Sequence, residues 1–89
     1  VKTNSFTNKM STTAALLSLT EVENAYPNGF KSFLHGCYYF LDQDGDLGYF
    51  IERIDGTFES ETQYVDFDTL AYNERAECEV IAEYISINS

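Results

Sequence analysis

The stretch from Gly36 to Phe58, GCYYFLDQDGDLGYFIERIDGTF, decides the fold. Its apolar and aromatic clusters are typical of strands, and an Asp-Gly pair follows each of the first two clusters. Asp-Gly between two apolar runs is a strong signal for a tight hairpin turn. The sequence therefore predicts a three-stranded antiparallel meander, with turns at Asp44-Gly45 and Asp55-Gly56 and strands at about 36–42, 48–54 and 57–66.

The segment before this meander has helical periodicity. Apolar residues recur every three or four positions up to Tyr26, which predicts a helix over Ser11–Tyr26 that ends before Pro27. Thr20 and Glu23 also offer a capping box, which would break this helix near Leu19. The residues at 30–35 are expected to be helical or irregular, and those at 1–10 to form a mobile tail.

After the meander, a second helix is predicted over Leu70–Ile85, capped by Asp68 or Thr69. Residues 76–86 also alternate between apolar and acidic side chains, which leaves a fourth strand as the alternative. Their richness in Ala and Glu favours the helix. The expected fold class is α+β, a small single domain over residues 11–89 with a helix, three strands and a helix in that order.

The charge of the chain is concentrated in its second half. The 89 residues carry a formal net charge of −10, of which residues 1–41 contribute +1 and residues 42–89 contribute −11. Direct binding to nucleic acid or to an anionic membrane needs Lys and Arg, so this charge argues against both. It favours a protein partner with a basic surface.

Apolar runs in the chain are all shorter than the ~18–20 residues of a membrane span. The first ten residues are polar and do not resemble a signal peptide, so we expect a soluble, cytoplasmic protein. Two cysteines, Cys37 and Cys78, are then expected to be buried free thiols.

The acidic turn after the first strand resembles part of a calcium loop. Asp42, Asp44 and Asp46 stand at alternate positions, as the first ligands of an EF-hand do. However, Leu47 stands where that loop requires Gly, and Arg53 where it requires Glu. We therefore expect a hairpin turn and no metal site, with weak calcium binding as an alternative.

His35, Cys37 and Cys78 are the residues that would suit zinc binding or thiol chemistry. A closed zinc site needs four ligands, and a cysteine nucleophile needs an orienting group and an oxyanion hole, none of which the sequence identifies. We expect a protein that is not an enzyme and has no cofactor.

The strand register predicts a cluster of carboxylates. If Ile54 faces Thr57 across the second turn, then Glu52 faces Glu59, and Glu61 lies on the same side of the sheet. Like charges across a ladder cost roughly 0.2–1 kcal/mol, and Glu79 and Glu83 repel each other on the predicted helix. Two explanations fit these costs: the acids are solvated surface charges that maintain solubility, as in most acidic proteins, or they imitate an array of phosphates and dock on a basic groove. The predicted partner-binding residues are Asp42, Asp44, Asp46, Glu52, Glu59, Glu61, Glu79, Glu83, Tyr49 and Tyr64, with Tyr38 and Tyr72 as further tyrosines near the surface.

These observations predict a non-enzymatic acidic binding protein that docks on a basic, nucleic-acid-binding surface of a partner, as an inhibitor or nucleic-acid mimic. No motif matches a named family. Small size and acidity are a style common among phage and mobile-element proteins that inhibit host nucleic-acid enzymes. The alternative is a small homodimeric accessory or structural domain with an aromatic interface.

Overall fold

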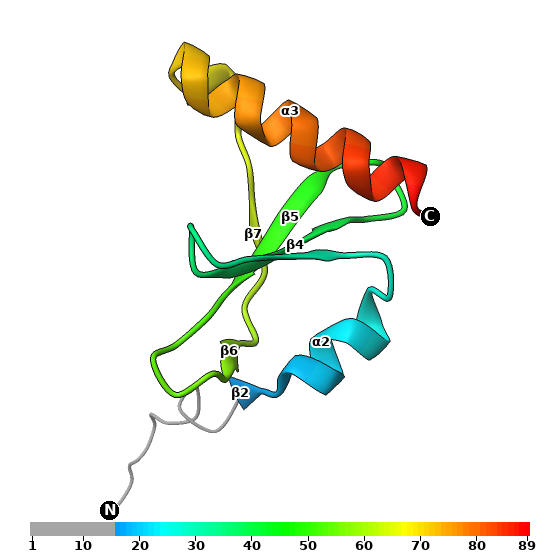
Figure 1. Ribbon diagram of the computed structural model, residues 1–89, viewed down its shortest axis with the longest axis vertical. Helices are drawn as coiled ribbons and strands as arrows, with labels where there is room; N and C mark the ends of the chain where they lie inside the picture. Colours follow the sequence, from blue (N-terminus) through cyan, green and yellow to red (C-terminus); the bar gives the residue numbers. More distant parts are fainter. Residues whose placement is uncertain (1–15) are drawn as a thin grey trace, which may run out of the picture.

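The computed structural model describes residues 16–89 and confirms the α+β class. Four strands form one antiparallel sheet in the order β3-β4-β5-β7, and β2 pairs with β6 in a second, two-stranded sheet. Helix α3 covers one face of the larger sheet, and α2 lies on the other side (Figure 1). The elements in chain order are β2 (Leu16–Leu17), α2 (Leu19–Ala25), β3 (Phe30–Ser32), β4 (Cys37–Leu41), β5 (Leu47–Ile51), β6 (Phe58–Glu59), β7 (Gln63–Tyr64), the 3-10 helix η2 (Phe67–Thr69) and α3 (Tyr72–Ile87).

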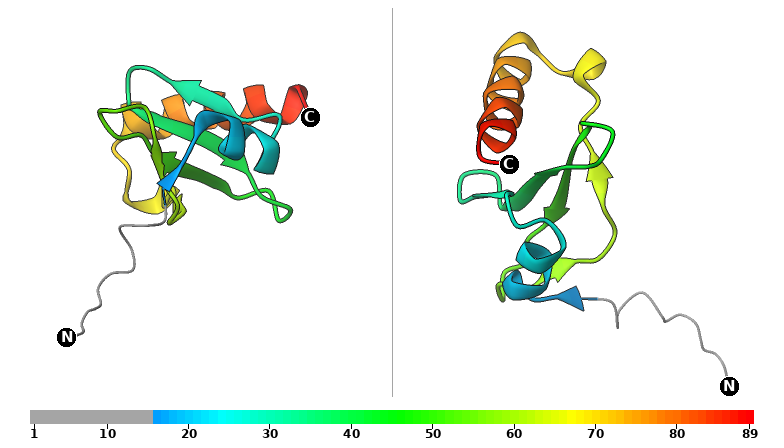
Figure 2. Two further views of the ribbon diagram at one scale, coloured as in Figure 1. Left: turned by 90° about the horizontal axis from the view of Figure 1, so that it is seen from below. Right: turned by 90° about the vertical axis from the view of Figure 1, so that its right-hand side faces the viewer.

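Strand β4 is the centre of the core, because both of its faces are covered (Figure 2). Tyr38 and Phe40 pack with Val22 of α2, whereas Cys37 and Tyr39 pack on the other face with Ile81 and Ile85 of α3. Successive side chains of a strand point to opposite faces. Burial on both faces therefore explains why β4 reads as an unbroken apolar run.

Helix α2 begins later than the sequence predicts, at Leu19. The Ser18 hydroxyl accepts a hydrogen bond from the Glu21 N–H at 3.1 Å, and the Glu21 carboxylate accepts one from the Ser18 N–H at 2.8 Å. This reciprocal capping box starts the helix, and the expectation of a box at Thr20 and Glu23 is wrong. Leu16 and Leu17 lie in β2, not in a helix, and the predicted tail and helix start at Ser11 lie outside the described residues.

Residues 30–32 form a strand, so the expectation of a helical or irregular segment is wrong there. Phe30 pairs with Tyr39 and Ser32 with Cys37, which makes β3 one border of the four-stranded sheet. A three-residue strand has too little pattern of its own to be distinguished from a loop, and its partner β4 determines its conformation.

The hairpin at Asp55-Gly56 has a three-residue loop instead of the predicted two-residue loop. The Arg53 N–H donates to the Thr57 carbonyl at 2.7 Å, and Gly56 adopts a left-handed φ of 87°. Glu52 therefore lies opposite Phe58, not opposite Glu59. A shift of one residue turns side chains to the other face, so the predicted alignment of Glu52 with Glu59 is wrong.

The predicted third strand is divided in two. Phe58 and Glu59 pair with β2, whereas Gln63 and Tyr64 pair with Tyr49 and Gly48 of β5. The chain bends at residues 60–62, because Phe58 is fully buried beside Val22 and Tyr38 while β7 returns to the sheet. The meander therefore continues from β5 to β7, and β7 is the border opposite β3.

The second helix is confirmed, and the alternative of a fourth strand at 76–86 is wrong. Ile81 and Ile85, one helical turn apart, are the buried residues of α3. The helix begins after Ala71, whose N–H donates to the Glu74 carboxylate at 3.3 Å. The predicted caps at Asp68 and Thr69 fall within η2, which Asp66 caps.

Candidate functional site: an acidic border

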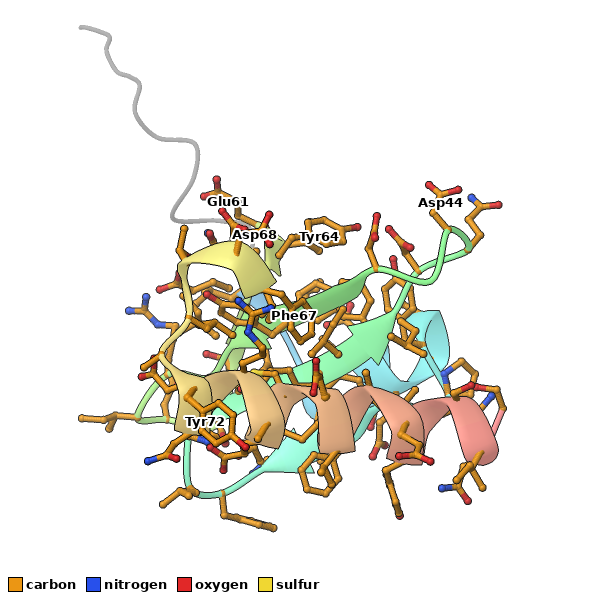
Figure 3. All side chains as sticks on the ribbon, turned by 90° about the horizontal axis from the view of Figure 1, so that it is seen from above. Asp44, Glu61, Tyr64, Phe67, Asp68 and Tyr72 are labelled. Atoms are coloured by element: carbon orange, nitrogen blue, oxygen red, sulfur yellow. The ribbon has the colours of Figure 1, made fainter. Side chains whose placement is uncertain are left out.

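Six carboxylates gather along the β7 side of the molecule. They come from the β4–β5 turn, from the bend before β7 and from η2 with its cap. Glu61 and Asp68 stand at one end of this side and Asp44 at the other, with Tyr64 between them, while α3 crosses the molecule in front (Figure 3). We call this set the acidic border: Asp42, Asp44, Asp46, Glu61, Asp66 and Asp68.

The β4–β5 turn is held in place by Asp42. Its Oδ1 atom accepts hydrogen bonds from the Asp44 and Asp46 N–H groups, each at 2.9 Å. The bond from Asp46, with further support from the Tyr64 hydroxyl, holds the pKa of the Asp42 carboxyl below its ordinary value of 3.8. The predicted turn at Asp44-Gly45 is confirmed, with Gly45 at a φ of 84°. These hydrogen bonds thus favour the ionised form of the Asp42 carboxyl.

Tyr64 stands at the middle of the acidic border. It is half-exposed, and its ring meets that of the buried Phe40 at 6.0 Å between centroids. The pKa of its hydroxyl is raised above the ordinary value of 10.0. Burial is the largest cause, and the neighbouring Asp42 carboxylate is the next. Tyr64 therefore links the acidic border to the core and remains a neutral hydrogen-bonding group at physiological pH.

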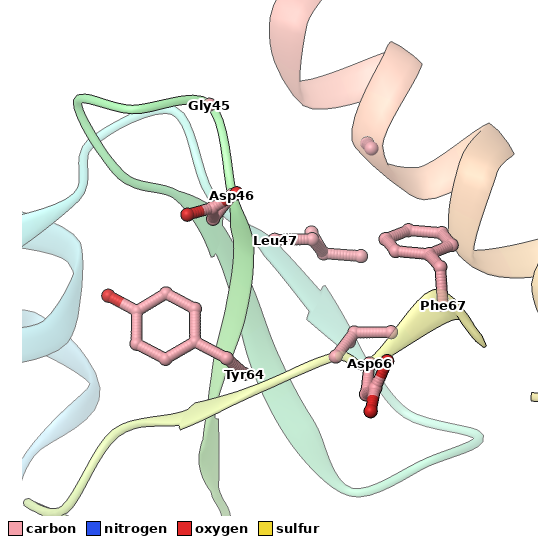
Figure 4. A pocket seen from close by; sticks show the side chains of 8 residues that line it. Gly45, Asp46, Leu47, Tyr64, Asp66 and Phe67 are labelled. Carbon is pink, nitrogen blue, oxygen red and sulfur yellow. The ribbon is translucent and has the colours of Figure 1, made fainter. Parts of the chain in front are cut away.

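A shallow pocket of about 390 Å³ opens beside Tyr64 (Figure 4). It lies between the β4–β5 turn, the segment from β7 to η2, and α3. Its rim carries two carboxylates of the acidic border, and its other residues are mainly apolar. The lining residues are Gly45, Asp46, Leu47, Tyr64, Val65, Asp66, Phe67 and Ala82.

The structure separates Glu52 and Glu59 from the acidic border. Lys31 Nζ lies 3.1 Å from Glu52 Oε1, and Arg53 Nη1 lies 3.7 Å from Glu59 Oε2. None of the ion pairs among residues 16–89 involves a carboxylate of the acidic border. In the part of the chain that the structure describes, these two bases therefore offset acids elsewhere and not those of the acidic border.

The remaining predicted residues are dispersed. Glu79 and Glu83 are exposed on α3, and Tyr49 is half-buried on the face of the sheet that α3 covers. The prediction that Tyr38 lies near the surface is wrong. Its side chain is 2% exposed, and its hydroxyl donates a hydrogen bond to the Tyr26 carbonyl at 2.6 Å. Tyr72 is exposed, as predicted.

Two members of the acidic border, Asp66 and Asp68, were not predicted as site residues. The Asp66 Oδ1 atom accepts from the Asp68 N–H at 3.1 Å, which starts η2. The sequence shows the spacing Asp-Phe-Asp directly after the last strand residues, and this repeats the alternation of the first acidic turn. That repetition is the signal in the sequence, where Asp68 is otherwise expected only as a helix cap.

The cysteines show little sign of reactivity. Cys37 is buried beside Tyr39 and Cys78, and burial raises the pKa of the Cys37 and Cys78 thiols. A raised pKa disfavours the thiolate that nucleophilic chemistry and zinc binding both use. His35 Nε2 lies 3.0 Å from Glu77 Oε2, on α3.

Among the described residues, one cluster of side chains could hold a metal ion. It consists of Asp42, Asp44 and Asp46, whose carboxylate oxygens lie within 4.8 Å of one another.

Calcium binding at this turn stays a prediction. Calcium takes six to eight oxygen ligands, whereas the described residues bring together three carboxylates. One oxygen of Asp42 already accepts two backbone hydrogen bonds.

The comparisons with known proteins add no relative: no family model, no curated protein and no solved structure matches the chain. Within residues 16–89, every helix is too short or too polar to cross a membrane.

Replacing Asp42 by alanine is expected to lower the melting temperature at neutral pH. Because the folded pKa lies below 3.8, ionised Asp42 stabilises the fold at higher pH, and this contribution is lost as the pH falls through the folded pKa. The difference in melting temperature between Asp42→Ala and the wild type should therefore shrink in acid. Thermal unfolding followed by circular dichroism across this range measures it. Asp44→Ala is the control, and a difference that stays constant well below pH 3.8 would contradict the role of Asp42.

Proposed function

We propose that this protein is a non-enzymatic binding protein that docks through its acidic border on a basic surface of a partner protein. The observation that carries the proposal is the gathering of six carboxylates on one side, without an ion pair to any described base. The like charges repel one another there. A basic partner would relieve this repulsion on binding, which gives the border a favourable electrostatic term.

The partner surface is inferred to be one that binds nucleic acid. Carboxylates displayed on turns at intervals imitate the phosphates of a nucleic-acid strand, and a groove built for phosphates carries the Lys and Arg that would meet them. Tyr64 adds an aromatic ring in the middle of the border, and tyrosines are enriched in protein interfaces. The protein would then act as an inhibitor or nucleic-acid mimic, in the style of proteins from phages and mobile elements.

A pull-down from a cell lysate at low and high salt tests this function. The Debye length falls from about 30 Å at 0.01 M salt to about 8 Å at 0.15 M salt, so capture through exposed charges should weaken steeply. The border variant combines Asp44→Asn, Glu61→Gln and Asp68→Asn, which remove three charges with little change in shape. Its matched control combines Glu23→Gln, Glu79→Gln and Glu83→Gln, three exposed acids on the two helices.

The wild type and the helix control are expected to capture the same partner at low salt, and the border variant to lose it. Equal loss in both variants would show that net charge alone drives capture, which contradicts a defined border. Capture that does not change with salt would contradict electrostatic docking altogether.

A further inference from the structure

A second pocket, of about 360 Å³, lies between the sheet and the segment in which η2 leads into α3. Its volume is within the range of about 300–1,000 Å³ that is usual for small-molecule sites. Tyr39 of β4 and Tyr49 of β5, which are partners in the ladder, line its sheet side. We call it the tyrosine pocket, after these two residues.

The Tyr39 hydroxyl is a buried polar group that lacks a strong partner. Tyr39 lines the tyrosine pocket and is 7% exposed. Within residues 16–89, its one hydrogen-bonding contact is the Cys37 thiol, and sulfur is a weak partner. Burial, and then the Cys37 thiol, raise the pKa of the Tyr39 hydroxyl, which therefore stays neutral. Most buried polar groups are hydrogen-bonded, so the Tyr39 oxygen offers an unfilled acceptor to a ligand that brings a donor.

Three carboxylates at the tyrosine pocket determine the charge of such a ligand. Glu77 lies beside His35, which is the only base among the lining residues. Asp66 and Glu74 each use one oxygen to accept a backbone N–H, and no described base forms an ion pair with either. An anion would be repelled here, whereas a cation would meet two uncompensated carboxylates.

The cation that fits is organic and not a metal ion. In the part of the chain that the structure describes, the one group of side chains close enough to share a metal ion is on the β4–β5 turn and includes no residue of this pocket. Tyrosine rings, by contrast, attract organic cations through their faces. Val65 and Leu70 add apolar surface, against which an alkyl chain can pack.

The arrangement of the rings and donors favours an ammonium over a guanidinium group. The rings of Tyr39 and Tyr49 lie 5.9 Å apart between centroids and are tilted by 58°, so they do not form a parallel slot for a planar guanidinium. A primary ammonium has three N–H donors around one nitrogen. It can therefore bind the Tyr39 oxygen and a carboxylate at the same time.

We propose that the tyrosine pocket binds a primary alkylammonium group, carried by a free amine or by a lysine side chain. The nitrogen would donate to the Tyr39 oxygen and to the carboxylates of Asp66 and Glu74. The alkyl chain would lie along Val65 and Leu70. The proposal does not depend on docking through the acidic border, because it is tested on the isolated protein with substitutions outside that border.

Titration of the isotope-labelled protein with n-butylammonium chloride, followed by NMR at neutral pH and constant ionic strength, tests the site. Butylammonium should give saturating shifts centred on the amides of the lining residues. Butanol, which lacks the charge, and butyrate, which has the opposite charge, should not. Nα-acetyl-lysine amide distinguishes the two sources: tighter binding than butylammonium assigns the pocket to a lysine side chain, and weaker binding assigns it to a free amine.

Two conservative variants test the contacts. Tyr39→Phe keeps the ring and should weaken butylammonium binding about tenfold, the loss expected for a hydrogen bond to a charged group. Tyr72→Phe, at a position that is 84% exposed, should bind like the wild type. Glu74→Gln keeps an oxygen for the helix cap and should weaken binding roughly threefold to fivefold. Its control is Glu79→Gln, which removes the same charge from another exposed position of α3.

Shifts that grow linearly without saturation, or butanol that binds as well as butylammonium, would overturn the proposal. Unchanged binding in both Tyr39→Phe and Glu74→Gln would overturn it too. Equal weakening in Glu74→Gln and Glu79→Gln would show that net charge alone attracts the amine, which also contradicts a defined site. Circular dichroism checks that each variant is folded, and Glu74→Gln, at an exposed position, tests the pocket without any change to the core.

Discussion

Replacing Phe40 by alanine is expected to destabilise the protein by about 3–5 kcal/mol, which is the usual cost of deleting a buried aromatic ring. Phe40 is fully buried, stacks on Tyr26 at 3.9 Å and contacts Phe50 at 5.2 Å between ring centroids. A domain of this size has a total stability of only about 5–15 kcal/mol. Urea unfolding should show a large fall in midpoint, or a chain already unfolded in buffer.

Phe33→Ala is the matched control, because it deletes the same ring from a position that is 87% exposed. Its effect should stay within about 1 kcal/mol, the contribution of an exposed cation–π contact, because the Lys31 ammonium lies 3.9 Å from the centre of this ring. Similar costs for the two variants would contradict the placement of Phe40 at the centre of the core.

Replacing Gly48 by alanine should cost about 1–3 kcal/mol, the range for a side chain forced into a filled site. Gly48 lies opposite Phe40 in the β4–β5 ladder, and a methyl group there would come within 2.5 Å of the Phe40 ring. The carbonyl oxygen of Gln63 closes the site at 3.1 Å. Thermal and urea unfolding measure the loss.

The clash can be tested by making room for the methyl group. Phe40→Leu alone removes part of the ring, and Gly48→Ala combined with Phe40→Leu should cost less than the two single changes added together. Simple additivity in this cycle would mean that the glycine is needed for another reason than contact with Phe40.

The sequence predicted the centre of the fold better than its periphery. Strands β4 and β5 and the turn between them were predicted because apolar runs and Asp-Gly are local signals. The division of the third strand was not, because it depends on the burial of Phe58 against α2, a contact distant in sequence. The short strand β3 was missed for another reason: three residues carry too little pattern, and pairing with the neighbouring strand β4 determines their conformation.

Four of the six residues of the acidic border could be predicted from the sequence, although the sequence groups the fourth, Glu61, with Glu52 and Glu59. Asp42, Asp44 and Asp46 lie on one turn, so local spacing places them together. The prediction for Glu52 and Glu59 depended on the hairpin register, and a loop longer by one residue placed both acids in ion pairs instead. Asp66 and Asp68 reach the border only through the return of β7 to β5, which no local pattern indicates.

Strand β4 lies between β3 and β5 in the sheet and is covered on one face by α2 and on the other by α3. Its amide hydrogens can therefore exchange with solvent only when the helices separate from the sheet, which is close to unfolding of the whole domain. Hydrogen exchange at β4 should thus report the global free energy of unfolding, whereas the amides of the exposed turns exchange through small local openings.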